Sequence, residues 1–211
     1  MIQLGAREAR IIGCLMEKSV TTPDQYPLSL NALTNACNQK SSRDPVMSLS
    51  EDEVNETLRQ LMAANLVTLD ANYRGRVEKY QQRMFNTPFA EVQLTEEMFA
   101  IICVLLLRGP ATPGELKTRC QRLHPFADNA EVTGVLQSMI DREEGAIIAR
   151  LPRTPGRQDH EYAQLFTGAV VTVAPPQQAA PARSETSRID ALEARIEALE
   201  AALSRLEDAQ R

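Results

Sequence analysis

Apolar residues recur at helical spacing in two stretches of the chain, and each stretch begins a similar series of elements. The pattern predicts one helix around Ile11–Leu15 and a counterpart around Ile101–Leu106. Each helix ends before a threonine–proline pair, which is typical of a turn followed by the start of another helix. Shorter second helices are expected over residues 28–37 and 113–123. The chain therefore contains an internal repeat.

A third helix follows in each copy, and both are introduced by capping residues. Ser50-x-x-Glu53 and Asp128-x-x-Glu131 place a side-chain acceptor where the first backbone N–H groups lack partners. Apolar residues then follow at spacings of three and four, which predicts one buried stripe on each helix. These residues are Val54, Leu58, Leu61 and Met62 in the first copy, and Val132, Val135, Leu136, Met139 and Ile140 in the second.

Strand-forming residues follow the third helix in both copies. Residues 66–69 and 76–80 flank a turn with Gly75, and residues 147–151 and 160–163 flank a turn with Gly156. Three helices and a hairpin are the elements of a winged helix-turn-helix. We therefore predict an α+β, mostly helical fold with two tandem winged helix-turn-helix domains. They are expected at residues 1–90 and 91–170.

The composition changes after the second copy. Residues 171–186 are rich in Pro and Ala, which is typical of a linker. Residues 187–211 carry a heptad pattern, with Ile or Leu at the first position and Leu at the fourth. The pattern predicts a parallel two-stranded coiled coil and hence a homodimer, while the alternative is a helix that packs on its own chain or frays. The dimerisation residues would be Ile189, Leu192, Ile196, Leu199, Leu203 and Leu206.

Several motifs of the two copies resemble the YceH-like family of uncharacterised bacterial proteins. The resemblance covers about residues 4–168, and it implies a tandem winged-helix fold. It implies little about activity, since the family is uncharacterised. The motifs are Cys14-Leu15-Met16-Glu17-Lys18, Thr21-Thr22-Pro23-Asp24-Gln25-Tyr26-Pro27-Leu28, Ala36-Cys37-Asn38-Gln39-Lys40, Arg43-Asp44-Pro45-Val46, Leu105-Leu106-Leu107-Arg108-Gly109 and Thr112-Pro113-Gly114-Glu115-Leu116.

Composition narrows the classes of function. The 211 residues hold 23 Lys and Arg against 28 Asp and Glu, and the net charge of −5 argues against bulk coating of nucleic acid or membrane. Residues 1–90 are neutral, and the surplus acid lies in the rest of the chain. The chain has no apolar stretch of membrane-spanning length and no signal sequence at its start, which favours a cytoplasmic protein with no membrane partner.

Catalytic chemistry has no visible basis in the sequence. Four cysteines are widely spaced and are expected to be buried thiols, and the two histidines, His124 and His160, form no metal-ligand pair. Phosphate loops and nucleophile motifs are absent from the sequence. We expect a non-enzymatic protein with no catalytic residue, no metal site and no cofactor.

The residues that could contact double-stranded DNA lie outside the third helices. The third helix of the first copy begins with four carboxylates in residues 51–56, and that of the second copy has no Lys or Arg. Basic residues instead lie on the hairpins, where the alternative is a solvated edge. An amide-rich turn joins the second and third helices, where the alternative is helix capping. The candidates are Arg74, Arg76, Lys79, Arg153 and Arg157 on the hairpins, and Asn35, Asn38, Gln39, Lys40 and Arg43 at the turn.

Two functions of different classes follow from these features. The first is a dimeric DNA-binding protein resembling a transcription regulator, which the basic hairpins and the heptads favour slightly. The second is an adaptor whose winged helices bind partner protein chains without DNA contact, which the acidic third helices favour.

Overall fold

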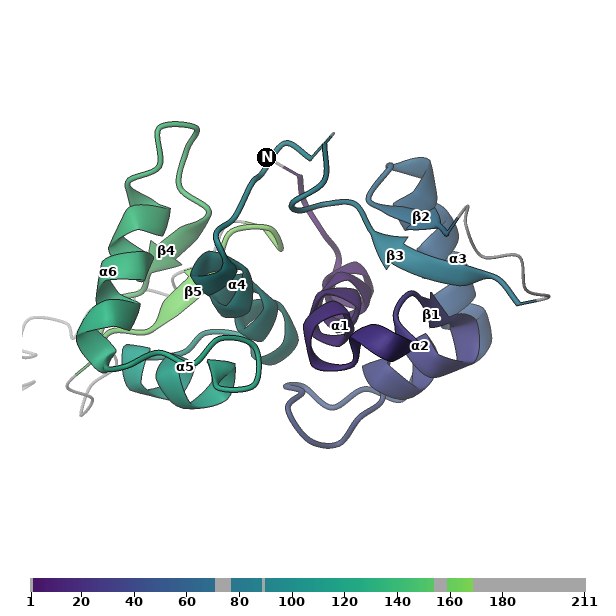
Figure 1. Cartoon of the computed structure of the whole chain (residues 1–211), viewed down its shortest axis with the longest axis horizontal. Helices are drawn as coiled ribbons and strands as arrows, with labels where there is room; N and C mark the ends of the chain where they lie inside the picture. The colour runs from purple at the N-terminus through teal and green to yellow at the C-terminus, as the bar shows by residue number, and fades with distance from the viewer. Residues whose placement is uncertain (1, 71–76, 89, 154–158, 169–211) are drawn as a thin grey trace, which may run out of the picture. The chain divides into compact units, whose positions relative to one another are not determined.

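Three helices and a small sheet make up the first repeat of the computed structural model (Figure 1), which describes residues 2–70, 77–88, 90–153 and 159–168. The helices are α1 (Ala6–Thr21), α2 (Leu30–Cys37) and α3 (Glu51–Ala63), with a 3-10 turn, η1 (Pro23–Gln25), between the first two. The strands are β1 (Leu28–Ser29), β2 (Val67–Leu69) and β3 (Lys79–Gln82). They form an antiparallel sheet in the order β1-β3-β2, with Leu28 opposite Tyr80 and Val67 opposite Gln82.

The second repeat has the same order of elements with a reduced sheet. Its helices are α4 (Glu96–Arg108), α5 (Pro113–Cys120) and α6 (Asn129–Ile140), and its strands are β4 (Ile148–Arg150) and β5 (Tyr162–Gln164). The two strands are antiparallel. A single bridge between Ala111 and Tyr162 takes the place that β1 has in the first repeat. The fold is thus α+β and largely helical, with small antiparallel sheets.

Capping hydrogen bonds in the structure confirm the predicted starts of both third helices. Ser50 Oγ accepts from the backbone N–H of Glu53 at 3.2 Å, and Glu53 accepts from the N–H of Ser50 at 3.0 Å, which completes a capping box. Asp128 accepts from the N–H of Glu131 at 2.9 Å. The second helix of the first repeat, predicted over residues 28–37, begins at Leu30. The two residues before it, Leu28 and Ser29, pair with β3 instead. Local periodicity cannot show such a pairing with a distant strand.

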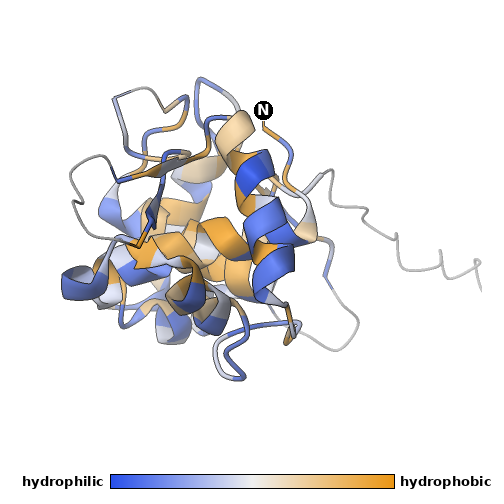
Figure 2. Ribbon diagram, turned by 90° about the vertical axis from the view of Figure 1, so that its right-hand side faces the viewer, coloured by the Kyte–Doolittle hydropathy of each residue, from blue (hydrophilic) through white to orange (hydrophobic). Residues whose placement is uncertain are grey.

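The helices α1 and α4 lie side by side where the two repeats meet (Figure 1). Both are buried on every side over one continuous run, Ala9–Met16 in α1 and Ala100–Leu107 in α4. Gly13 permits the close approach, since a Cβ there would lie 2.8 Å from Leu107 Cδ2. Figure 2 accordingly shows the apolar segments gathered in the interior of the protein. The two repeats therefore share one core.

The two repeats also contact each other through segments near their ends. The N–H of Leu4 donates to the carbonyl of Phe166 at 2.6 Å, and the rings of Phe85 and Phe166 meet edge to face with centroids 5.2 Å apart. All these residues belong to one compact unit, Met1–Thr172. Among the described residues, no helix has both the length and the apolar character that a membrane crossing needs. The predicted linker and the predicted coiled coil lie outside the described residues.

Candidate functional site: the α2–α3 loop and its adjoining cleft

The connection between α2 and α3, residues 38–50, is here called the α2–α3 loop, and its two ends are joined by one side chain. Asn38 Nδ2 donates to the carbonyl of Leu49, and the N–H of Leu49 donates back to Asn38 Oδ1, both at 2.7 Å. The sequence prediction placed Asn38 in a DNA-contacting group. The structure instead shows its amide closing the loop, so that this side chain is already occupied.

Arg43 fixes the middle of the loop from inside. Its side chain is fully buried and donates to both carboxylate oxygens of Glu17, at 3.1 and 2.7 Å. Its Nε donates to the carbonyl of Ala36 at 3.1 Å. Burial alone would raise the pKa of Glu17, but the hydrogen bonds and charge of Arg43 hold that pKa below its ordinary value. Arg43, also a predicted DNA contact, therefore acts as an internal anchor.

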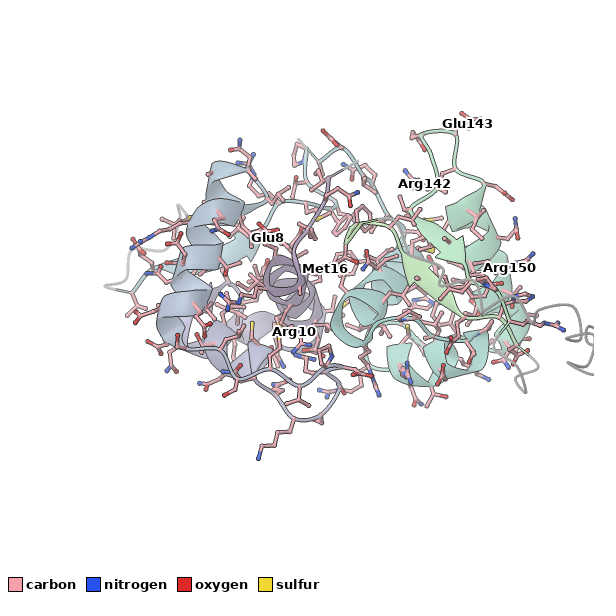
Figure 3. All side chains as sticks on the ribbon, turned by 180° about the vertical axis from the view of Figure 1, so that it is seen from behind. Glu8, Arg10, Met16, Arg142, Glu143 and Arg150 are labelled. Carbon is pink, nitrogen blue, oxygen red and sulfur yellow. The ribbon has the colours of Figure 1, made fainter. Side chains whose placement is uncertain are left out.

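A second buried arginine joins the loop to α1. Arg10 is 2% exposed, and it donates to the carbonyls of Cys37 at 3.0 Å and Pro45 at 2.6 Å. Figure 3 shows Arg10 extending from α1 towards the loop. The loop also reaches the second repeat, because the N–H of Asp44 donates to the carbonyl of Leu107 in α4 at 2.9 Å. The loop is thus attached to three helices.

The outer side of the loop remains exposed. Lys40, Ser41 and Ser42 are all exposed, and Val46 is 57% exposed. Ser42 has a φ of +59°, a left-handed conformation that is strained for a residue other than glycine and often marks functional sites. The internal anchors therefore hold an exposed tip of small, charged and apolar side chains, Asp44 among them, in one conformation.

A narrow cleft opens beside the loop, and both repeats line it. Three arginines of the second repeat face it, Arg108 at the end of α4 and Arg119 and Arg122 in and after α5. Its free volume is about 40 Å³. Its lining residues are Glu17, Thr21, Ser42, Val104, Leu107, Arg108, Arg119, Arg122 and Leu123.

The basic residues of this cleft are not among those predicted from the sequence. Cations were expected on the hairpins and at the turn before the third helix, where a winged helix would meet DNA. The sequence nevertheless contains a cluster of cations in this region, because Lys117, Arg119 and Arg122 lie within six residues. Burial lowers the pKa of Arg108, the neighbouring charge of Arg119 lowers it further, and the carboxylates of Asp44 and Glu115 offset this only in part. The cleft is therefore a place where positive charges crowd one another.

The third helices present little positive charge. In α3, Glu51 accepts from Asn31 Nδ2 at 2.8 Å, and Arg59, which is exposed, lies 3.7 Å from Glu56. In α6 the exposed side chains are uncharged apart from Glu131. Apart from Arg59, and Arg7 of α1, which pairs with Glu53 at 2.7 Å, these surfaces would meet the phosphates of DNA with carboxylates and neutral groups.

The remaining predicted contact residues are dispersed. Asn35 is exposed on α2 and donates to Asn31 Oδ1 at 3.1 Å. Gln39 is half-buried, Lys79 is half-buried on β3, and Arg153 is exposed after β4. Other candidates lie outside the described residues, namely Arg74, Arg76, Arg157, Ile189, Leu192, Ile196, Leu199, Leu203 and Leu206.

The four thiols are buried, as predicted. Interaction with the neighbouring thiol of Cys14, together with burial, raises the pKa of Cys37 strongly. Burial raises the pKa of Cys120 to about 12 and that of Cys103 well above its usual range. Cys37, Cys103 and Cys120 are therefore protonated at neutral pH and are poor nucleophiles.

Comparison with known proteins finds relatives without an assigned activity. Residues 4–157 match the model of a family described as "Protein of unknown function, DUF480". A UPF0502 protein of Vibrio vulnificus is 54% identical over 163 residues, which covers 77% of this chain and 74% of the relative. A UPF0502 protein of Vibrio campbellii is 49% identical over 193 residues, which covers 91% of this chain and 89% of the relative. A third, of Shewanella woodyi, is 53% identical over 169 residues, covering 80% and 77%.

Proposed function

Because the chain belongs to the DUF480, or UPF0502, family of uncharacterised bacterial proteins, we propose a function from its geometry: it is a non-enzymatic tandem winged-helix adaptor that binds partner protein chains. The order of helix, short strand or bridge, two helices and hairpin in both repeats supports the winged-helix assignment. The YceH-like name suggested by the motifs stays a prediction.

The charge on the third helices is the observation that carries this proposal. A winged helix that reads DNA inserts its third helix into the major groove, and its affinity comes largely from Lys and Arg on phosphates. Here α3 begins with Glu51, Asp52 and Glu53, and α6 contains no Lys or Arg. Such surfaces are repelled by phosphates, whereas protein surfaces can complement them.

The α2–α3 loop supplies the second support. A loop that is held in one conformation before binding loses less conformational entropy when a partner docks on it. Val46 is an exposed apolar side chain on such a loop, between Pro45 and Met47, and the buried core of a protein interface is largely apolar.

A DNA-binding dimer remains the second candidate, because exposed cations lie on the second hairpin. Arg150 ends β4 on the outside of the second repeat (Figure 3), and Arg153 follows it. Contact of this kind would use the hairpins in place of the third helices. The homodimer implied by the heptads would double those contacts.

Binding of the full chain to a mixed-sequence DNA duplex separates the two candidates. The adaptor proposal expects no change in fluorescence anisotropy at 50 mM salt, a condition that strengthens phosphate contacts. Binding that weakens steeply with salt, and that is lost in R150Q/R153Q, would contradict it in favour of DNA contact through the hairpin.

Two exposed valines give a matched test of the protein interface. Val46 lies on the α2–α3 loop and Val77 on the first hairpin, and they are 57% and 54% exposed. A partner captured by the wild-type chain should bind V46D at least tenfold more weakly and V77D with unchanged affinity. The reverse order would place the interface on the hairpin and contradict the role of the loop.

A further inference from the structure

The cleft beside the α2–α3 loop combines a carboxylate and two hydroxyls from the first repeat with three guanidinium groups from the second. Glu17 and Thr21 belong to α1, and Ser42 belongs to the loop. Arg108, Arg119 and Arg122 face them from the second repeat. A group bound here would contact both repeats at once.

The three guanidinium groups are only partly compensated. Arg119 Nη2 lies 3.1 Å from Glu115 Oε1, in an ion pair along α5. Arg108 and Arg122 make no side-chain hydrogen bond or ion pair with the residues that the structure describes. Like charges held together in a partly buried site cost free energy, and a bound anion would remove that cost.

Glu17 does not cancel this charge. Among the described residues that line the cleft, it is the one carboxylate. Both of its oxygens accept from Arg43, and Lys18 Nζ lies 3.4 Å from Oε2. Its negative charge is therefore used by cations that do not line the cleft, and the cleft itself stays positive.

Ser42, on the α2–α3 loop, contributes a neutral donor to the lining of the cleft. Its left-handed backbone is fixed because Arg43 Nη1 donates to the carbonyl of Ser42 at 2.9 Å. Within the described part of the chain, the Ser42 hydroxyl has no hydrogen-bond partner. The anchoring that holds the loop thus also holds a free hydroxyl at the edge of the cleft.

We propose that this cleft binds a phosphate group, as inorganic phosphate or as the terminal group of a small phosphomonoester. Guanidinium forks match phosphate oxygens in geometry and charge. A water molecule needs about 10–15 Å³ of such free volume, so a cleft of about 40 Å³ admits a group of a few heavy atoms and excludes a duplex. The proposal goes beyond the adaptor function and does not depend on it.

Titration of the full chain with inorganic phosphate and with methyl phosphate tests the site, with amide chemical shifts as the readout and chloride holding the ionic strength constant. We expect saturable shifts at Ser42, Arg108 and Arg119 with both probes. R108Q and R122Q should each weaken binding at least tenfold. R59Q, which removes an exposed arginine from α3, should leave it unchanged. Circular dichroism confirms that each variant is folded.

Three outcomes would overturn the proposal. The first is an equal response to chloride alone, and the second is an equal loss of binding in R59Q. The third is tighter binding of a tetraglutamate peptide than of either phosphate, which would assign the cleft to carboxylates. Binding of both phosphates with loss in R122Q supports the proposal even if R108Q does not fold. None of these results depends on whether a protein partner is found.

Discussion

The two repeats share an order of elements but place their charges differently. The first repeat buries Arg10 and Arg43, which are 2% and 5% exposed. In the described part of the second repeat the one buried polar side chain is Gln164, which bonds to its own neighbours. The cations of α5 lie instead at the surface or along the cleft. The same scaffold thus carries an ionic interior in one copy and an apolar interior in the other.

The length of the connection before the third helix explains this difference. The two buried arginines donate to the carbonyls of Ala36 and Cys37 at the end of α2 and to that of Pro45 within the α2–α3 loop. Buried carbonyls need donors, and a long loop outside any helix or sheet cannot supply enough of its own. The connection between α5 and α6 is shorter and buries Phe126, whose ring meets that of His124 edge to face.

Removal of Arg43 should produce the largest difference between the repeats. R43M removes the buried donor of Glu17 and of the carbonyl of Ala36, and breaking a buried ion pair of this kind costs about 3–5 kcal/mol. R119M removes a helix-surface pair with Glu115 and should cost about 0.3–0.5 kcal/mol. Urea denaturation measures both, and equal losses would contradict the comparison.

Two glycine-to-alanine substitutions should change the stability of the fold in opposite directions. G13A places a methyl group 2.8 Å from Leu107 Cδ2 at the contact of α1 with α4, and overpacking of this kind costs about 1–3 kcal/mol. G134A on α6 meets nothing within 4 Å and should stabilise the chain by about 0.5–1 kcal/mol through helix propensity. Thermal denaturation gives the sign directly. A stabilising G13A would show that the helices α1 and α4 are not tightly packed.

The ion pair of the first repeat should also give stability a pH dependence. The pKa of Glu17 is held below its ordinary value, so its contribution is complete above the unfolded pKa of about 4.3 and is lost as pH falls through the folded pKa. The stability difference between wild type and E17Q should therefore shrink on acidification below about pH 4. Urea denaturation from pH 7 to pH 3 measures it, and a constant difference would contradict the assignment.

Local features of the chain were predictable from the sequence, and long-range ones were not. Capping at Ser50 and Asp128 depends on neighbours three residues away, so the helix starts could be predicted. Arg43 belongs to a polar stretch, and its partner Glu17 lies 26 residues earlier, which periodicity cannot reveal. The cleft was missed for the same reason, because it forms only when the α2–α3 loop meets α4 and α5.

Hydrogen exchange at two backbone amides tests the central claim, which is that buried arginines of the first repeat hold its loop rigid. The N–H groups of Asp44 and Leu49 bond to Leu107 and Asn38. We expect both to exchange as slowly as the amides of α3, and to exchange at least tenfold faster in R43M. The amide of His124, in the connection between α5 and α6, should not change. Exchange of Asp44 and Leu49 in the wild-type chain at the rate of an unprotected loop would contradict the account.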